Sequence, residues 1–300
     1  MPYALWLFGG LLATFPASIL SGLFGRRAAF ALGASFGLAG GLLAGWGFVA
    51  GQFPALLIGA LWLGLAQGFG LFYRHAAATT GGTTAVAAVF SAGALAMFAA
   101  PATIFGLAKL GPLGPAALFV AAGVISLAAM ASALTLPEAP NLRCDHTAAR
   151  VPVSVFIAAT ATSAFAWFIM TALMGATPNM LAGCGYGVAA ASGLIAWHML
   201  AMYLPAAAIA PLAAKIGLGR LIALGLVLLC GAVALVWQGN LLPITAALTL
   251  AGIGWSLVTF SGMLKLHENG PASRLTIASF DALVFSGAIL GALSAHVWLF

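Results

Sequence analysis

The chain has 300 residues, of which 64% are hydrophobic and only 5% are charged. A soluble domain carries roughly 25% charged residues, so this composition excludes a fold with a water-facing surface all round. The ten Lys and Arg residues outnumber the four Asp and Glu residues. They stand singly or in pairs, however, which is typical of membrane topology and argues against a nucleic-acid partner. We therefore expect the lipid bilayer to surround this protein.

Apolar runs of about 20 residues, each long enough to cross a hydrocarbon core, recur along the whole chain. A backbone inside lipid must satisfy its own hydrogen bonds, so it can form only helices or a closed barrel. The apolar runs lack the period-two alternation of barrel strands. We therefore expect an all-α integral membrane fold of about ten transmembrane helices. The predicted spans are 3–23, 28–50, 52–73, 84–107, 113–136, 152–174, 181–205, 219–238, 241–264 and 277–297.

The most polar stretch of the chain, LPEAPNLRCDHTAAR at 136–150, lies between the fifth and sixth spans. It divides the protein into an N-terminal five-helix half at 1–136, a cytoplasmic linker at 137–150 and a C-terminal five-helix half at 151–300. All basic residues except Lys109 fall in loops on one side of this topology. Positively charged loops stay in the cytoplasm, so both termini are predicted to be periplasmic.

The two halves carry a related pattern. PASILSGLFGRR at 16–27 resembles PAAAIAPLAAKIGLGR at 205–220, and the next basic loops repeat the same offset of about 190 residues. One helix precedes the Gly-basic turn in the first half, whereas two precede it in the second. This offset predicts a six-plus-six repeat that lacks its first and last helices, and the turn resembles that of major facilitator transporters.

Two pairs of metal-ligand side chains lie inside predicted helices, Met170-x-x-x-Met174 and His198-x-x-x-Met202. Residues four apart share one helical face, so each pair presents two ligands in one direction. Thioether and imidazole are soft to borderline donors that suit copper. The alternative is that the methionines fill the core. A histidine in an apolar helix is harder to explain without a function.

Other candidate residues carry less information. Asp281 is expected to pair with Arg274 or to cap a helix, with a proton carrier as the alternative. Cys184 either hands copper inward or fills the core. The remaining candidates are Gln67, Tyr73 and Arg74 as pathway or anchoring residues, and Cys144 with His146 as a linker metal pair. The three cysteines form no disulfide framework. No hydrolase, zinc-protease or nucleotide-binding signature is present, so we expect neither catalytic residues nor a cofactor.

The stretches PASILSGLFGRR, LFYRHAAA, MTALMGATPNM, IAWHMLAMYLP and ASFDALVFSGAILGALSA resemble the CcoA-like copper importer branch of the major facilitator superfamily. The resemblance covers nearly the whole chain and implies a twelve-helix fold in the bacterial inner membrane, from which the first and last helices are missing here. It assigns copper binding to Met170, Met174, His198 and Met202. The chain departs from the family pattern at Ala206 and Thr79.

These observations lead to the hypothesis of an importer that carries copper by alternating access through the Met/His site. A first alternative is a transporter of a small organic solute such as riboflavin, with Trp167, Trp197 and Trp255 as stacking surfaces. A second is a membrane protein that binds without transporting, its cavity covered by a second copy of the chain as a homo-oligomer.

Overall fold

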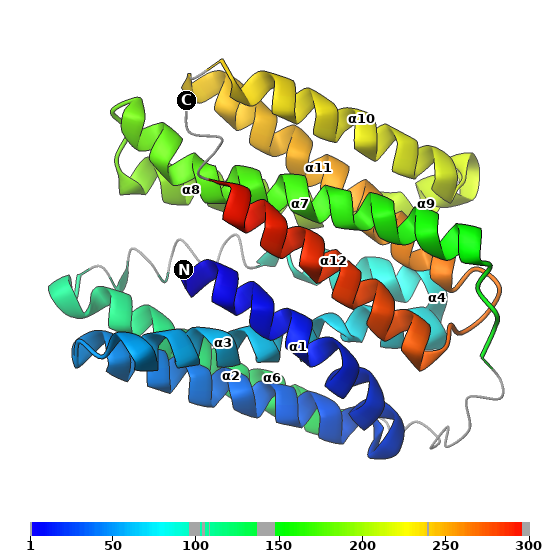
Figure 1. Cartoon of the computed structure of the whole chain (residues 1–300), viewed down its shortest axis with the longest axis horizontal. Coiled ribbons are helices and arrows are strands. Elements are labelled where there is room, and N and C mark those ends of the chain that lie inside the picture. Colours follow the sequence, from blue (N-terminus) through cyan, green and yellow to red (C-terminus); the bar gives the residue numbers. More distant parts are fainter. Residues whose placement is uncertain are drawn as a thin grey trace. The chain divides into compact units, whose positions relative to one another are not determined.

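The structure is a computed structural model of the chain and describes residues 2–95, 103, 106–107, 109–136, 148–238 and 240–295. Its described residues form α-helices joined by short turns, with one 3₁₀ turn at Gly111–Leu113 (Figure 1). The α-helices are α1 (Pro2–Leu23), α2 (Gly25–Val49), α3 (Phe53–Leu71), α4 (Tyr73–Ala92), α6 (Gly114–Thr135), α7 (Val153–Gly183), α8 (Val188–Tyr203), α9 (Ala206–Ile216), α10 (Leu218–Val236), α11 (Leu241–Leu266) and α12 (Arg274–Ser294).

The prediction of an all-helical membrane fold is confirmed. Within the described residues, nine helical stretches are long and apolar enough to cross a membrane. One of them, Phe53–Ala92, joins α3 to α4, and another, Ala189–Ile216, runs from α8 into α9. The count therefore agrees with about ten predicted spans once the joined pair α3 and α4 is separated at Phe72.

The helices group into two compact units. Unit 1 comprises Met1–Tyr73, Ala102–Ala149 and Ala272–Phe285, and unit 2 comprises Arg74–Pro101, Arg150–Pro271 and Ser286–Phe300. Each predicted half thus contributes one segment to the unit formed mainly by the other half. The linker predicted at 137–150 lies outside the described residues except for its last three positions.

In unit 1, α2 packs against α1, α3 and α6. Its buried residues are all Gly or Ala apart from Phe30. A Cβ atom added at Gly41 would lie 2.6 Å from the backbone nitrogen of Gly123 on α6, so these two helices meet backbone to backbone. Small residues allow such close approach between membrane helices, where dispersion contacts replace the hydrophobic effect as the driving force.

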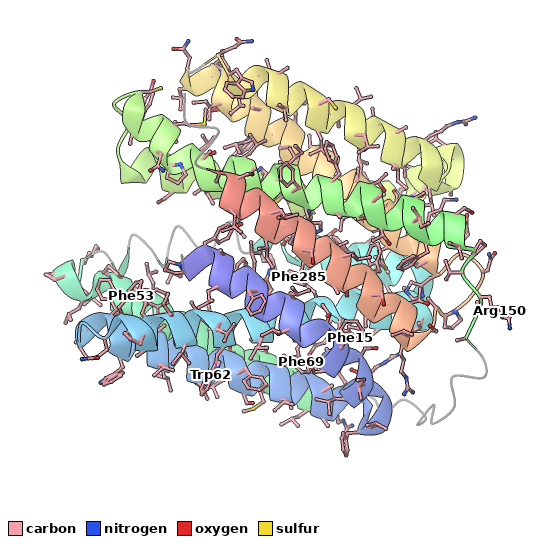
Figure 2. All side chains as sticks on the ribbon, viewed as in Figure 1. Phe15, Phe53, Trp62, Phe69, Arg150 and Phe285 are labelled. Atoms are coloured by element: carbon pink, nitrogen blue, oxygen red, sulfur yellow. The ribbon has the colours of Figure 1, made fainter. Side chains whose placement is uncertain are left out.

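Aromatic side chains supplement this small-residue packing at the α2–α3 contact. Phe36 of α2 lies with its ring centroid 6.3 Å from those of both Trp62 and Phe69 on α3. Trp62 and Phe69 are labelled in Figure 2. The contacts of α2 in unit 1 are therefore built mainly from small residues and aromatic rings.

In unit 2, α11 is the central helix and contacts α7, α8, α9 and α10. It is the most buried of the candidate spans, since 56% of the residues in its membrane-spanning part are buried inside the protein. Because α11 is covered by neighbouring helices, polar side chains along it are shielded from lipid. Such positions are where membrane proteins place functional polar groups.

Two helices differ from their predicted spans. α4 begins eleven residues before the span expected at 84–107, and its helical geometry breaks only at Gly82, which has φ 60°. α7 continues nine residues beyond the span expected at 152–174 and contains Pro178. A helix within the membrane tolerates proline when other groups satisfy the freed backbone.

Within each unit, helix ends that carry basic residues lie together. In unit 1 the Nε of Arg27 donates to the Leu136 carbonyl at 2.7 Å, and the Ser18 hydroxyl donates to the Arg274 carbonyl at 3.0 Å. In unit 2 the first turn of α4 meets the end of α11 through His75 and His267. These contacts agree with the predicted clustering of basic loops, while the membrane side that they face stays a prediction.

Candidate functional site

The four predicted metal ligands lie on α7 and α8 of unit 2. Met170 and Met202 are buried, Met174 is half-buried and His198 has no exposed surface. In the described part of the chain, no three His, Cys, Asp or Glu residues gather into a group that could hold a metal ion. A metal-binding role for the two methionine-containing pairs stays a prediction.

The His198 ring is engaged with the backbone of α11. Its Nδ1 lies 2.6 Å from the carbonyl oxygen of Leu248. A carbonyl oxygen only accepts hydrogen bonds, so Nδ1 must carry a proton in this contact. The other ring nitrogen, Nε2, is buried and has no hydrogen-bond partner among the described residues.

An aromatic cluster surrounds Trp255 on α11, which is 1% exposed. We use the name aromatic cluster for Phe90, Trp167, Tyr203, Trp255 and Phe260. The ring centroid of Trp255 lies 5.3 Å from that of Trp167 and 5.8 Å from that of Tyr203, both in edge-to-face contact. Phe90 of α4 lies 6.3 Å from Trp255 and 5.7 Å from Phe260. Four helices thus bring aromatic faces and edges to one place, suited to flat, unsaturated molecules.

Buried hydroxyl groups accompany the cluster on α7 and α11. Several side-chain oxygens have no hydrogen-bond partner among the described residues, as does the indole Nε1 of Trp255. These buried hydroxyls belong to Thr160, Ser163, Ser256, Thr259 and Ser261. A buried polar group without a partner costs about 1–3 kcal/mol, so a concentration of such groups indicates a place where a polar ligand or water binds.

The other sequence candidates lie elsewhere. Trp197 is 45% exposed, and its indole nitrogen donates to the Thr249 hydroxyl at 2.9 Å, so it is not part of the aromatic cluster. Tyr73 stacks on Phe30 in unit 1 with ring centroids 3.7 Å apart. Asp281 is buried and Cys184 is exposed. Gln67 is half-buried on α3 of unit 1, and Cys144 and His146 lie outside the described residues.

Sequence reasoning missed a contact between two histidines of unit 2. The Nδ1 of His75, at the start of α4, lies 3.2 Å from the Nε2 of His267, at the end of α11. His75 is 1% exposed. The repeat offset contained the signal, because the two histidines are 192 residues apart.

No family model matches the chain. Among curated proteins, the chain is 31% identical over 305 residues to the riboflavin transporter RfnT of Brucella anthropi, a match that covers 96% of this chain and 76% of that protein. It is also 34% identical over 138 residues to the MFS-type transporter YddS of Bacillus subtilis, which is uncharacterized, covering 44% of this chain and 32% of that protein.

Solved structures of low sequence identity share the fold. The human organic anion transporter MFSD10 superposes with a TM-score of 0.68 at 17% identity, covering 99% of this chain and 77% of that one. The Escherichia coli fucose:proton symporter FucP superposes with a TM-score of 0.58 at 13% identity, covering 96% of this chain and 89% of that one. At these identities the likeness concerns the fold alone.

These comparisons correct the prediction of copper import, which is wrong. A relative that matches nearly the whole chain is a transporter of riboflavin, which is an organic solute and not a metal ion. The physical reason is that Met and His residues four positions apart show that two side chains lie on the same helical face, but they do not identify the transported molecule. Methionine is also a common core filler, and in this structure one nitrogen of His198 serves a backbone contact.

The broader resemblance holds. A relative above 30% identity covers 96% of the chain, and a second relative is described as an MFS-type transporter. The chain belongs to the major facilitator superfamily of membrane transporters.

Proposed function

We propose that this protein transports riboflavin or a closely related flavin across the membrane. The observation that carries the proposal is the 31% identity to a riboflavin transporter over 96% of the chain. This cargo was the first alternative that the sequence offered, and it suits the chemistry of unit 2 better than a metal ion does.

The aromatic cluster and the buried hydroxyls supply what a flavin requires. The isoalloxazine ring system is flat and aromatic, whereas its imide edge and its ribityl tail are polar. Phe90, Trp167, Tyr203 and Trp255 offer stacking and edge contacts within one region, and the same helices α7 and α11 carry buried hydroxyls without partners among the described residues. Ligand sites combine an apolar lining with a few such polar groups.

The transport mechanism proposed is alternating access, with the N-terminal half at 1–136 moving against the C-terminal half at 151–300. The protein would lie in the bacterial inner membrane with both termini periplasmic. Trp255 lies on the central, most buried helix of unit 2, so its side chain is shielded from lipid. It is therefore the residue on which we place most of the stacking.

The experiment is riboflavin uptake in a bacterial strain that neither makes nor imports this vitamin. Expression of the protein should restore uptake, and excess unlabelled riboflavin, but not copper, should compete. The Trp255→Ala variant should lower uptake by about five- to 150-fold, the range that stacking of a base on an aromatic side chain contributes. Normal amounts of the variant in the membrane must be verified by immunoblot.

A matched control is Trp46→Ala, because Trp46 is 57% exposed and lies on α2 of unit 1. Its loss should leave uptake unchanged. Absence of riboflavin uptake by the wild-type protein in proteoliposomes of confirmed orientation would refute the proposed function. Equal effects of the two substitutions would leave the cargo in place but remove the aromatic cluster from its recognition.

A further inference from the structure

His198 is a buried side chain whose protonation pattern the structure defines. It has no exposed surface, and its Nδ1 donates to the Leu248 carbonyl at 2.6 Å. An ionised side chain buried without an opposite charge is costly, so the ring is the neutral tautomer with its proton on Nδ1. In that tautomer Nε2 carries a lone pair and can only accept a hydrogen bond.

This acceptor is unused by the protein. Nε2 is inaccessible and has no hydrogen-bond partner among the described residues. The other buried groups of unit 2 without a partner among the described residues differ from it, because a hydroxyl both donates and accepts, and an indole nitrogen only donates. Among these buried groups, the Nε2 atom of His198 is therefore the one that can bind only a hydrogen-bond donor of a ligand.

His198 lies at the same helix–helix interface as the aromatic cluster. Contacts between α8 and α11 advance together along both helices, so the two helices run in the same direction. The contacting pairs are Trp197 with Thr249, His198 with Leu248, Ala201 with Gly252 and Tyr203 with Trp255. His198 and Tyr203 are five positions apart, which is about 7.5 Å along a helix. A three-ring molecule is long enough to contact both levels.

Two of the buried hydroxyls follow Trp255 along α11. Ser256 directly follows Trp255, and Thr259 lies one turn further along α11. The acceptor of His198 and the rings of Tyr203 and Trp255 thus lie along this interface, and two buried hydroxyls follow on α11. A flavin carries an imide N–H at one end of its three-ring aromatic system and a polyol tail on N10 of the middle ring. The imide N3–H is the only N–H of the oxidised ring system.

We propose that Nε2 of His198 accepts a hydrogen bond from the imide N3–H of the flavin, and that this residue determines specificity for an unsubstituted imide. The inference rests on the proposed function, since it names the atom of that cargo which His198 recognises. The backbone contact to Leu248 acts as the positioning element, because it fixes both the ring orientation and the tautomer.

The test is competition for riboflavin uptake by two analogues. One is 3-methylriboflavin, which lacks the N3–H donor, and the other is 5-deazariboflavin, which retains it. For the wild-type protein, 3-methylriboflavin should compete about tenfold or more less well than riboflavin, whereas 5-deazariboflavin should compete about equally. In the His198→Ala variant the wild-type preference over the methylated analogue should disappear, although overall uptake also falls.

His198→Gln serves as the second variant, because its amide oxygen is again an acceptor, and it should recover part of the preference. Trp197→Ala, one residue away on the exposed face of α8, is the matched control and should keep the full preference. Riboflavin uptake by the wild type without discrimination against 3-methylriboflavin would overturn this inference and leave the proposed function standing. An unchanged preference in His198→Ala would overturn it equally. If the wild type takes up no flavin, both proposals fail.

Discussion

Unit 1 and unit 2 are built from similar apolar helices, yet they bury different chemistry. In unit 1 the helix with most neighbours, α2, buries Gly and Ala almost exclusively. In unit 2 the central helix α11 buries Trp255, Ser256, Thr259 and Ser261. Among the described residues of unit 1, buried side-chain atoms without a partner occur only at Ser21 and Gln67.

This difference separates two tasks of a transporter. Backbone-to-backbone packing gives a stable scaffold, because close helices gain many dispersion contacts. Buried polar atoms without partners lower stability, so they persist where a ligand uses them. Close packing occurs in both units, since Gly225 and Gly254 also bring α10 and α11 together. The contrast therefore lies in the buried polar atoms, and it assigns most of the recognition to unit 2.

The largest effect should come from filling the α2–α6 contact. Gly41→Leu places a side chain where a Cβ would already lie 2.6 Å from the Gly123 nitrogen, and overpacking of this kind costs about 3 kcal/mol. The folded yield, measured as the monodisperse fraction in size-exclusion chromatography, should collapse. Gly70→Leu, on α3 of the same unit with open space around it, is the control. A normal yield of Gly41→Leu would show that unit 1 is not the rigid scaffold inferred here.

The next effect should come from freezing a contact of unit 2. His75 belongs to the first predicted half and His267 to the second, and their ring nitrogens are 3.2 Å apart. Rocking of the halves must separate them. In a variant with Cys144, Cys184 and Cys230 replaced by Ser, we expect a short bis-methanethiosulfonate cross-linker, which joins His75→Cys to His267→Cys through two disulfides, to abolish uptake. A reductant, which cleaves these disulfides, should restore it.

The control for this cross-link is the pair Phe30→Cys and Tyr73→Cys, whose parent rings stack 3.7 Å apart within unit 1. Linking these two positions should leave uptake intact, since both belong to the same half and the same unit. Full transport with the histidine positions cross-linked would contradict the proposed movement of the halves.

Removing the buried hydroxyls should have a smaller effect, which raises stability and lowers transport. Ser256→Ala with Thr259→Val removes two polar atoms that have no partner among the described residues. The melting temperature should rise by a few degrees, corresponding to about 1 kcal/mol, while riboflavin uptake should fall several-fold. Thr245→Val is the control, because its hydroxyl donates to the Leu241 carbonyl at 2.7 Å within α11. A lower melting temperature in the double variant would show that these hydroxyls are structural.

Hydropathy predicted most of the helices because lipid forces the backbone to pair internally along each apolar run. It failed at the start of α4, where the sequence TTGGTT suggests a loop. In the structure Thr79 and Thr80 donate to the Ala76 carbonyl, each at 2.9 Å, so these polar side chains are satisfied within the helix. A scale of residue polarity does not include such bonds.

The candidate site could be predicted only in part. Trp167, Trp255 and His198 were recognisable as unusual residues inside apolar helices, but their neighbours come from α4, α7, α8 and α11, and no local pattern encodes that convergence. For the same reason, the MxxxM and HxxxM motifs could not predict which molecule is transported. Ligand-type residues at i and i+4 specify a direction, whereas recognition depends on which donors and acceptors the surrounding helices leave unused.

The grouping of Trp167 and Trp255, with ring centroids 5.3 Å apart, also has an optical consequence. Flavins absorb in the wavelength range in which tryptophan emits, so a flavin bound beside these two indoles would quench their fluorescence by energy transfer. Trp46, Trp197 and Trp237 are exposed and can be replaced to reduce the background. The protein would then report occupancy of its own site without any attached label.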